Sequence, residues 1–296
     1  MKQPQQRLPR FTRDADAAGS FQFTKRDLEI LRHVAEHRFI RSNWLINLVG
    51  GSHQQLLRRL NLLYHHGYLE RPRCQIDYYH KGGSKNLVYG LASRGAGRLR
   101  HDLDMPFSRM EWTTRNRRIG RLFLEHTLMV SDFMAALELE CRARVDVRLF
   151  YGSELPKPKG REQSRAPFRW TVDLPGKRSV SVVPDKVFAI NTTRTDGKVT
   201  RIHYFLEADR GTMPVIRKST QKSSIYVKLK SYLVLHTSDL NFISRPNSKV
   251  CVLILVDSVP RQKNIRTIIH KLTRGRAFIL MRCKADSSIR DSILSN

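Results

Sequence analysis

Apolar residues recur every three or four positions along residues 52–66, which predicts an amphipathic helix in this stretch. Its apolar stripe consists of Leu56, Leu60 and Leu63. Ser52 is placed to cap the helix, and Gly67 is placed to end it. The polar face carries side chains that donate hydrogen bonds to base edges and phosphates, namely Gln54, Gln55, Arg58 and Arg59, with Ser52 at its start. This composition is typical of a recognition helix in a major groove.

The segments on both sides extend this pattern. Two shorter helices are predicted upstream, one after a cap at Thr24 and one over residues 41–49, closed by two glycines. Downstream, an extended segment from Gly67 and a strand over residues 86–91 flank the glycines of a hairpin tip, where Lys81 and Lys85 would meet phosphates. The order predicts a winged helix-turn-helix domain over residues 21–103. A helix and hairpin module that binds protein is the alternative.

The remainder of the chain alternates between helical and strand-like patterns. A long amphipathic helix is predicted from Ile119 to about Arg144. The segments that follow read in order as strand, strand, strand, helix, strand, helix and strand, at residues 145–151, 179–190, 200–208, 215–236, 250–256, 261–272 and 277–281. Asp196-Gly197 is a turn signal between the second and third of these strands. The pattern predicts an α/β domain with a central sheet over residues 119–296.

Charge is the unusual feature of the composition. The chain has 54 Lys and Arg against 26 Asp and Glu, a net charge of +28, which predicts a polyanionic partner. The longest apolar run, residues 250–256, is too short to span a bilayer, so nucleic acid is favoured over a membrane. Residues 1–20 are predicted to be a flexible basic arm and residues 104–118 a basic linker. Three linker arginines would contact phosphate: Arg115, Arg117 and Arg118.

The four cysteines and one histidine pair bear on metals and location. The cysteines form no Cys-x-x-Cys pair, which argues against a zinc ribbon and fits a reducing cytoplasm. His33-Val34-Ala35-Glu36-His37 has the spacing of an inverted zinc peptidase motif. No third ligand is evident in the sequence, so a solvated helix face is the favoured interpretation.

Acidic residues at the ends of two predicted strands suggest a magnesium site. Asp185 begins one strand of the predicted hairpin, and Glu207 and Asp209 end the other, with their side chains on one face. Carboxylate oxygens suit Mg²⁺, which would polarise a phosphodiester. The alternative is a set of strand-end acids paired with nearby basic residues.

The element order, with its Pro-Asp and Glu-x-Asp, resembles the core of the PD-(D/E)xK nuclease superfamily over roughly residues 119–283. The resemblance implies that Asp185 and Glu207 hold magnesium and that Glu125 is the acid of the first helix. The superfamily's lysine position is occupied by Asp209, a departure that puts hydrolysis in doubt. Lys228, on the next helix, would have to substitute for that lysine.

Taken as a whole, the chain resembles the replication-relaxation family of bacterial plasmids and mobile elements over about residues 24–283. The most specific piece is Glu207-Ala208-Asp209-Arg210-Gly211-Thr212. The resemblance implies a role in DNA replication, transfer or maintenance of the element. Together with the predicted winged domain, it favours a protein that binds double-stranded DNA sequence-selectively and whose second domain grips the neighbouring DNA. A Mg-dependent nuclease and a winged-helix transcription regulator are the alternatives. A homodimer and contacts with other replication proteins stay open.

Overall fold

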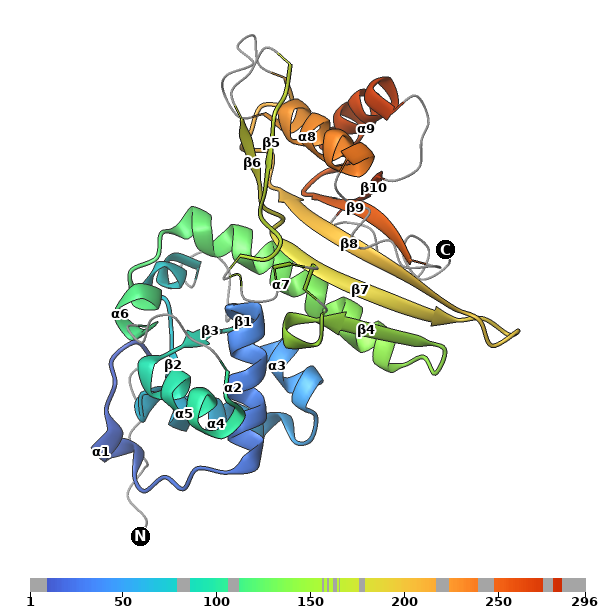
Figure 1. Cartoon of the computed structure of the whole chain (residues 1–296). Coiled ribbons are helices and arrows are strands. Elements are labelled where there is room, and N and C mark those ends of the chain that lie inside the picture. Colours follow the sequence, from blue (N-terminus) through green and yellow to red (C-terminus); the bar gives the residue numbers. More distant parts are fainter. Residues whose placement is uncertain are drawn as a thin grey trace. The chain divides into compact units, whose positions relative to one another are not determined.

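The computed structural model describes residues 10–78, 86–105, 112–155, 157–158, 160–161, 164, 166–175, 179–216, 224–238, 248–273 and 279–283. The chain divides into two compact units, Met1–Leu139 and Glu140–Asn296 (Figure 1). The sequence places the second domain from residue 119 onward. The division between the two units falls within the long helix that begins near that residue.

The first unit contains helices around a small antiparallel sheet. In chain order its central elements are α2 (Lys25–His37), β1 (Phe39–Arg41), α3 (Ser42–Val49), α4 (His53–His65), β2 (Leu69–Glu70), β3 (Val88–Leu91) and α5 (Ser93–Leu103). The strands pair in the order β1-β3-β2, so β3 lies between the other two. The apolar stripe of α4 is buried as predicted, because Leu56, Leu60 and Leu63 are part of the core of this unit.

Local signals explain where these helices begin and end. Thr24 forms a capping box with Asp27 at the start of α2, which satisfies donors that the first helical turn leaves without partners. Gly50 and Gly51 both have positive φ angles and end α3, as the sequence predicts. Gly67, with a φ of 77°, follows α4, and the Tyr68 amide donates back to the carbonyl of Leu63.

Other parts of the first unit depart from the predicted pattern. The segment after β2 forms a 3₁₀ helix, η1 (Arg73–Tyr78), where an extended strand is predicted. Helices α6 (Trp112–Arg117) and α7 (Arg121–Arg142) follow α5. Helix α7 is attached to this unit through Asp132, which accepts hydrogen bonds from Trp44 Nε1 at 2.8 Å and from Arg41 Nε at 3.2 Å.

The described part of the amino-terminal arm is packed against the first unit. It contains the short helix α1 (Ala15–Ala18). Arg13 donates to the carbonyls of Tyr64 and Leu69 at 3.0 and 2.9 Å, and the Asp14 amide donates to His65 Nδ1 at 3.0 Å. This differs from the flexible arm predicted for residues 1–20. The physical reason is that Arg13 finds backbone acceptors at the end of α4 and in β2, which sequence periodicity does not reveal.

The second unit is built on a mixed five-stranded sheet in the order β10-β9-β8-β7-β4. Its strands are β4 (Val147–Tyr151), β7 (Lys186–Thr193), β8 (Val199–Asp209), β9 (Ser248–Val256) and β10 (Ile279–Cys283). Strands β8, β9 and β10 are parallel neighbours, whereas β7 runs antiparallel to both β8 and β4. Gly197 turns the chain between β7 and β8, as its turn signal predicts.

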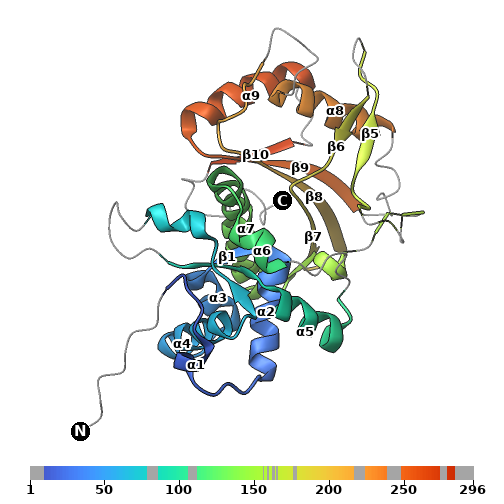
Figure 2. The ribbon, with the colours of Figure 1, turned by 90° about the vertical axis from the view of Figure 1, so that its left-hand side faces the viewer.

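Two helices cover one face of this sheet, α8 (Ile225–Ser238) and α9 (Val259–Thr273) (Figures 1 and 2). A short 3₁₀ helix, η2 (Gly152–Glu154), and a two-stranded sheet of β5 (Trp170–Val172) and β6 (Val180–Val182) complete the unit. Phe205, Tyr232 and Val252 belong to the core between sheet and helices. The prediction of helices and a mixed central sheet is confirmed. The single strand predicted over residues 179–190 is two strands in the structure, β6 and β7, which belong to different sheets, and strand β5 is not predicted from the sequence.

Candidate functional site

Two carboxylates meet at one end of the β7 and β8 pair. Lys186 pairs with Leu206 in this antiparallel ladder, so the register places Asp185 directly across from Glu207. The Asp185 amide donates to the Leu206 carbonyl at 2.9 Å, and Asp185 Oδ2 accepts from the Ala208 amide at 2.8 Å. The structure therefore brings together the two acids that the sequence places at a candidate site.

Helix α8 supplies two partners for Glu207. The hydroxyl of Tyr232 donates to Glu207 Oε1 at 2.5 Å, and the ammonium group of Lys228 forms an ion pair with Glu207 Oε2. Lys228 and Tyr232 are four residues apart and so lie on the same side of the helix. Glu207 is 5% exposed and Tyr232 1%, whereas the Lys228 side chain is 36% exposed, so only the contact with Tyr232 is fully buried.

Burial and charge shift the ionisation of this cluster. The pKa of Glu207 is raised to about 7, because burial and the charge of Asp185, which raise it, outweigh Lys228 and Tyr232, which lower it. Burial lowers the pKa of Lys228, but the charges of Glu207 and Asp185 outweigh it and raise this pKa above its usual value. Burial also raises the pKa of Tyr232 well above its usual value, so its hydroxyl stays protonated as a donor to Glu207.

Asp209 has a different partner from Glu207. Arg261, in the first turn of α9, donates from Nε to Asp209 Oδ2 at 2.6 Å and from Nη2 to Oδ1 at 3.3 Å. Arg261 also donates to the carbonyl of Met213. Asp209 therefore fixes α9 and the chain after β8. Arg261 was missed by sequence reasoning, because nothing local links it to an acid more than 50 residues earlier.

A pocket opens beside Glu207 between the sheet and α8. It is lined by Glu207, Ala208, Asp209, Ile225, Lys228, Leu229, Tyr232, Val252 and Ile254. The donor types suit a hard cation, because Asp185 and Glu207 both offer carboxylate oxygens. The Lys228 ammonium holds the Glu207 oxygen that such a cation would use, so Mg²⁺ would bind here only by displacing that ammonium.

Glu125 lies in the first unit rather than in the second. It is near the start of α7, where Arg121 Nε donates to Glu125 Oε1 at 2.8 Å within the same helix. The site described above is built from residues of the second unit alone. Glu125 therefore has a local ion pair, and within the second unit the acids that act on Lys228 are Glu207, Asp185 and Asp209.

The polar residues of α4 fall into two groups in the structure, because most are exposed and one forms an ion pair within the first unit. Ser52, Gln54, Gln55 and Arg58 are exposed. Within the described part of the chain the Ser52 hydroxyl makes no capping hydrogen bond, although Ser52 is at the N-cap position. Arg59 instead binds the carboxylate of Asp27, which is completely buried, and donates to the carbonyl of Gln22. Arg59 thus joins α4 to α2, a role that its place on the polar face does not predict.

The three linker arginines also differ in their surroundings, because two are exposed and one forms an ion pair. Arg115 and Arg118 are exposed, and the guanidinium of Arg115 lies 5.9 Å from the ring centre of Trp112. Arg117 forms an ion pair with Glu70, from Nε to Oε1 at 3.6 Å. Lys81 and Lys85, the predicted hairpin lysines, lie outside the described residues.

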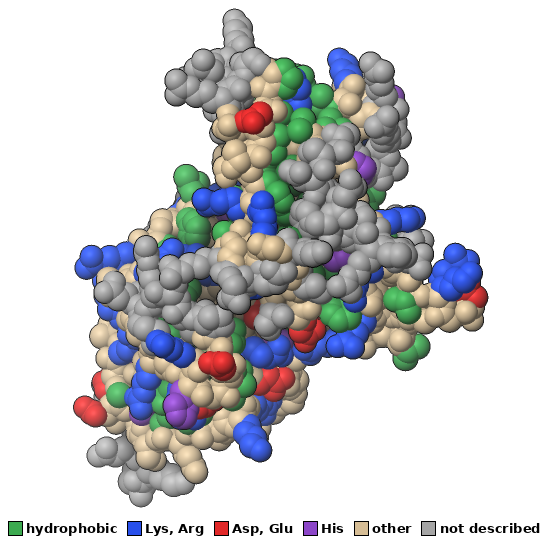
Figure 3. Space-filling view, viewed as in Figure 1, with side chains coloured by type: hydrophobic (Ala, Val, Ile, Leu, Met, Phe, Trp, Pro, Cys, Tyr) green, Lys and Arg blue, Asp and Glu red, His purple; other side chains and the backbone are tan. Residues whose placement is uncertain are grey.

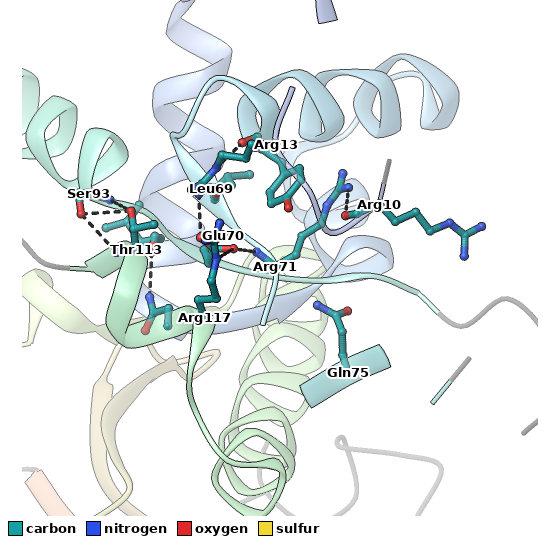
Figure 4. A network of polar contacts seen from close by, with 12 residues as sticks. Arg10, Arg13, Leu69, Glu70, Arg71, Gln75, Ser93, Thr113 and Arg117 are labelled. Atoms are coloured by element: carbon teal, nitrogen blue, oxygen red, sulfur yellow. Dashed lines mark hydrogen bonds and ion pairs between the residues drawn. The ribbon is translucent and has the colours of Figure 1, made fainter. Parts of the chain in front are cut away.

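Glu70 and Arg71 organise a buried polar network beside α4 (Figure 4). Glu70 is 1% exposed, accepts a hydrogen bond from Arg13 Nη2 at 2.8 Å and forms an ion pair with Arg117. Arg71 is 2% exposed and donates to the Arg10 carbonyl at 2.7 Å and to Asn61 Oδ1 at 2.8 Å. The sequence predicts that Arg117 contacts phosphate and that Arg13 lies in a flexible arm. In the structure both arginines instead form ion pairs with Glu70 and stabilise the first unit.

The histidines of the zinc-like motif are not on a solvated helix face. His33 is 0% exposed and His37 is 5% exposed. Both face the interior of the first unit, because α2 turns this side toward α7. The favoured interpretation from sequence was wrong, since helical spacing alone does not show that a second helix covers the histidines.

Positive side chains are spread widely over the described surface. Figure 3 shows Lys and Arg side chains on many parts of the visible face, with acidic groups between some of them. No helix among the described residues is both long and apolar enough to cross a membrane. Basic side chains on the described part of this face are thus distributed over the surface.

Comparison with known proteins gives a family but no close relative. No curated protein and no solved structure matches the chain. The replication-relaxation family matches residues 31–240, which include α4 and both strands that carry Asp185 and Glu207. This match spans more than half of the 296 residues. The protein therefore belongs to the replication-relaxation family, which indicates a role in the replication or transfer of a plasmid or mobile element.

Proposed function

We propose that the protein binds a specific site on double-stranded DNA through α4. The observation that carries this proposal is the row of exposed donors along the first half of that helix, Ser52, Gln54, Gln55 and Arg58. These are side chains that hydrogen bond to base edges in a major groove. The apolar side of the same helix is fully buried, so the donors are presented on a rigid support.

The order of elements supports this proposal. Helices α2, α3 and α4 are followed by the β2 and β3 pair, with β1 between α2 and α3 and on the far side of β3. That is the arrangement expected of a winged helix-turn-helix, in which the last helix of the three enters the major groove. The exposed Arg115 and Arg118 would add phosphate contacts that position α4 on the DNA without contributing to sequence selection.

We propose that the second unit grips DNA next to the selected site. The net charge of +28 exceeds what one reading helix would use, and it includes exposed Lys and Arg on the second unit such as Arg194 and Lys198. Such charges bind phosphates without regard to sequence and make the affinity depend on salt. The protein would thus mark a site and hold the flanking duplex during replication or transfer.

Footprinting and titration test this function. The DNA flanking the protein's own gene is the first target, and the protected site is then placed in labelled duplexes. Arg58→Ala is expected to lower affinity for this site by about 1–3 kcal/mol and to reduce its preference over unrelated DNA. Lys25→Ala, at an exposed position of α2, removes the same charge and is the matched control. Equal effects of both variants on site and non-site DNA would reject selective reading by α4.

Duplex length tests the second unit separately. If that unit grips flanking DNA, affinity should increase when the duplex is extended beyond the footprint of the first unit. The logarithm of the binding constant should also fall more steeply with salt on the longer duplex. A transcription regulator whose second unit only dimerises or senses would show no such dependence on length.

A metal-dependent nuclease is a second candidate. The observation that favours it is the meeting of Asp185, Glu207 and Lys228, two carboxylates and a lysine, of which Glu207 and Lys228 line one pocket. Mg²⁺ would supply a Lewis acid for a phosphodiester, and the lysine released from Glu207 would be able to contact a phosphate. This candidate requires Lys228 to leave the ion pair that it forms in the structure.

Nicking of supercoiled plasmid in the presence of Mg²⁺ or Mn²⁺ tests the nuclease. Wild type should nick, whereas Asp185→Asn and Glu207→Gln should lose activity. Asp196→Asn, at the exposed turn between β7 and β8, is the matched control. The same residual cleavage in wild type and all three variants would discard the catalytic proposal and leave DNA binding intact.

A further inference from the structure

Two histidines and a glutamate form a buried cluster in the first unit. His33 and His37 lie on α2, four residues apart, and therefore share one face of that helix. Glu138, on α7, completes the group. The exposed fractions of the three residues are 0%, 5% and 8%. Leu139 is the last residue of the first unit, so all three ligand candidates belong to that unit.

The geometry points to a metal site. One nitrogen from each histidine and one oxygen from Glu138 all lie within 4.8 Å of one another. Ligand atoms on a tetrahedral zinc ion, with bonds of about 2.0–2.1 Å, are about 3.3 Å apart. Small rotations of the side chains would therefore close the group around an ion. We infer that His33, His37 and Glu138 bind one transition metal ion, with Zn²⁺ the best match.

The chemistry of the three groups selects this class of ion. Neutral imidazoles suit zinc and related transition metals, and one carboxylate offsets part of the ion's charge in a buried setting. Two histidines and one glutamate are also a common set of three protein ligands for zinc. Ions that prefer oxygen, such as Ca²⁺ and Mg²⁺, would find a single carboxylate here and bind poorly.

The position of the cluster defines what the metal would do. Helix α2 supports α3 and α4 in the core of the first unit, and α7 packs against the same unit through Ala135 and Asp132. A metal held by residues of α2 and α7 would join segments about 100 residues apart in the sequence and would contribute its binding energy to folding. The metal is therefore inferred to be structural, and it differs from the magnesium considered for the second unit.

Cobalt spectroscopy on the full chain tests this site directly. After removal of bound metal with a chelator, Co²⁺ should bind at one equivalent and give visible absorption bands of a low-coordinate site. Zn²⁺ should displace the cobalt and raise the unfolding temperature by several degrees. Glu138→Gln should weaken binding at least tenfold, because it removes the only anionic ligand. Absence of stoichiometric Co²⁺ binding by wild type would overturn the inference.

Two further measurements keep the test decisive if Glu138→Gln does not fold. His37→Cys should add a sulfur-to-cobalt charge-transfer band, because a thiolate would replace an imidazole ligand. His53→Cys, at an exposed position of α4, is the matched control and should add no band. The inference fails if the His37→Cys and His53→Cys spectra are the same, or if Glu138→Gln folds and binds Co²⁺ like wild type.

Discussion

The guanidinium of Arg59 binds both carboxylate oxygens of Asp27, and this contact joins α4 to the start of α2. Asp27 is 0% exposed and is also the residue that completes the capping box with Thr24. Hydrogen bonding to Asp27 raises the pKa of Arg59 although burial opposes it. One carboxylate therefore holds the first turn of α2 and the middle of α4 in a fixed relation.

Arg59→Ala should destabilise the first unit, whereas Arg58→Ala should not. Removing Arg59 leaves the buried carboxylate of Asp27 without its positively charged partner. The resulting loss of unfolding free energy is large for a buried ion pair. Because the side chain of Arg59 is 24% exposed, solvent screens part of this loss, and about 2 kcal/mol is expected. Urea unfolding followed by circular dichroism measures the difference.

The adjacent arginine is the control for this prediction. Arg58 is exposed, so its replacement should change stability by less than about 0.5 kcal/mol while lowering DNA affinity. Equal stability of the Arg59→Ala and Arg58→Ala proteins would contradict a structural role for Arg59.

Glu207 should make the stability of the second unit depend on pH. The pKa of this carboxyl is about 7 in the folded protein against an ordinary value of 4.5. Between these values the folded protein holds a proton that the unfolded chain releases, so stability must fall as the pH rises. The contribution is present below about pH 4.5 and is lost as the pH passes through about 7. The difference between the two pKa values corresponds to roughly 3 kcal/mol of unfolding free energy.

Urea unfolding of wild type and Glu207→Gln between pH 5 and pH 8 measures this dependence. The glutamine cannot titrate, so its protein should lose less stability across this range than wild type loses. Glu154→Gln, at an exposed position of η2, is the control and should follow wild type. Parallel curves for wild type and Glu207→Gln would show that the carboxyl titrates alike in both states.

Arg261 should be essential to the packing of α9. Asp209 is 6% exposed, and Arg261 supplies two hydrogen bonds to it and a third to the Met213 carbonyl. Arg261→Gln would leave the buried carboxylate of Asp209 without a positively charged partner, and the unfolding free energy is expected to fall by about 3 kcal/mol. Lys263→Gln removes the same charge at an exposed position of α9 and should cost less than about 0.5 kcal/mol. Thermal unfolding of the two variants distinguishes them, and equal unfolding temperatures would refute the prediction.

Local patterns account for the elements that the sequence predicts well. The stripe of Leu56, Leu60 and Leu63 and the cap at Thr24 depend on residues within one or two turns, so they can be read without knowing the fold. The same holds for the turn at Gly197. The apolar and alternating runs likewise locate β8 and β9, whereas the run at residues 179–190 covers β6 and part of β7 and does not show the break between them.

Contacts between distant segments account for what the sequence does not predict. Arg59 and Arg117 look like DNA ligands until Asp27 and Glu70 are placed beside them. His33 and His37 look solvated until α7 brings Glu138 to them. In the candidate site, the predicted hairpin brings Asp185 and Glu207 together. The partner of Asp209 is Arg261 on α9, and no local sequence pattern shows that this helix lies beside β8.

Gly95 should tolerate no side chain, although it lies within α5. Alanine favours a helix over glycine by about 1 kcal/mol, so a gain in stability would be expected if space were available. A Cβ atom at Gly95 would instead overlap the backbone carbonyl oxygen of Tyr68, which cannot rotate away as a side chain can. The overlap should outweigh the helical preference and leave Gly95→Ala about 1–3 kcal/mol less stable than wild type.

Gly120→Ala is the comparison for this substitution, because among the described residues no atom lies within 4 Å of the Cβ it would add. It precedes α7 and should change stability by less than about 1 kcal/mol. Urea unfolding of both variants measures the difference. A more stable Gly95→Ala protein would mean that β2 and α5 can separate at little cost. In that case the close approach of Tyr68 to α5 would not be what positions the strands that follow α4.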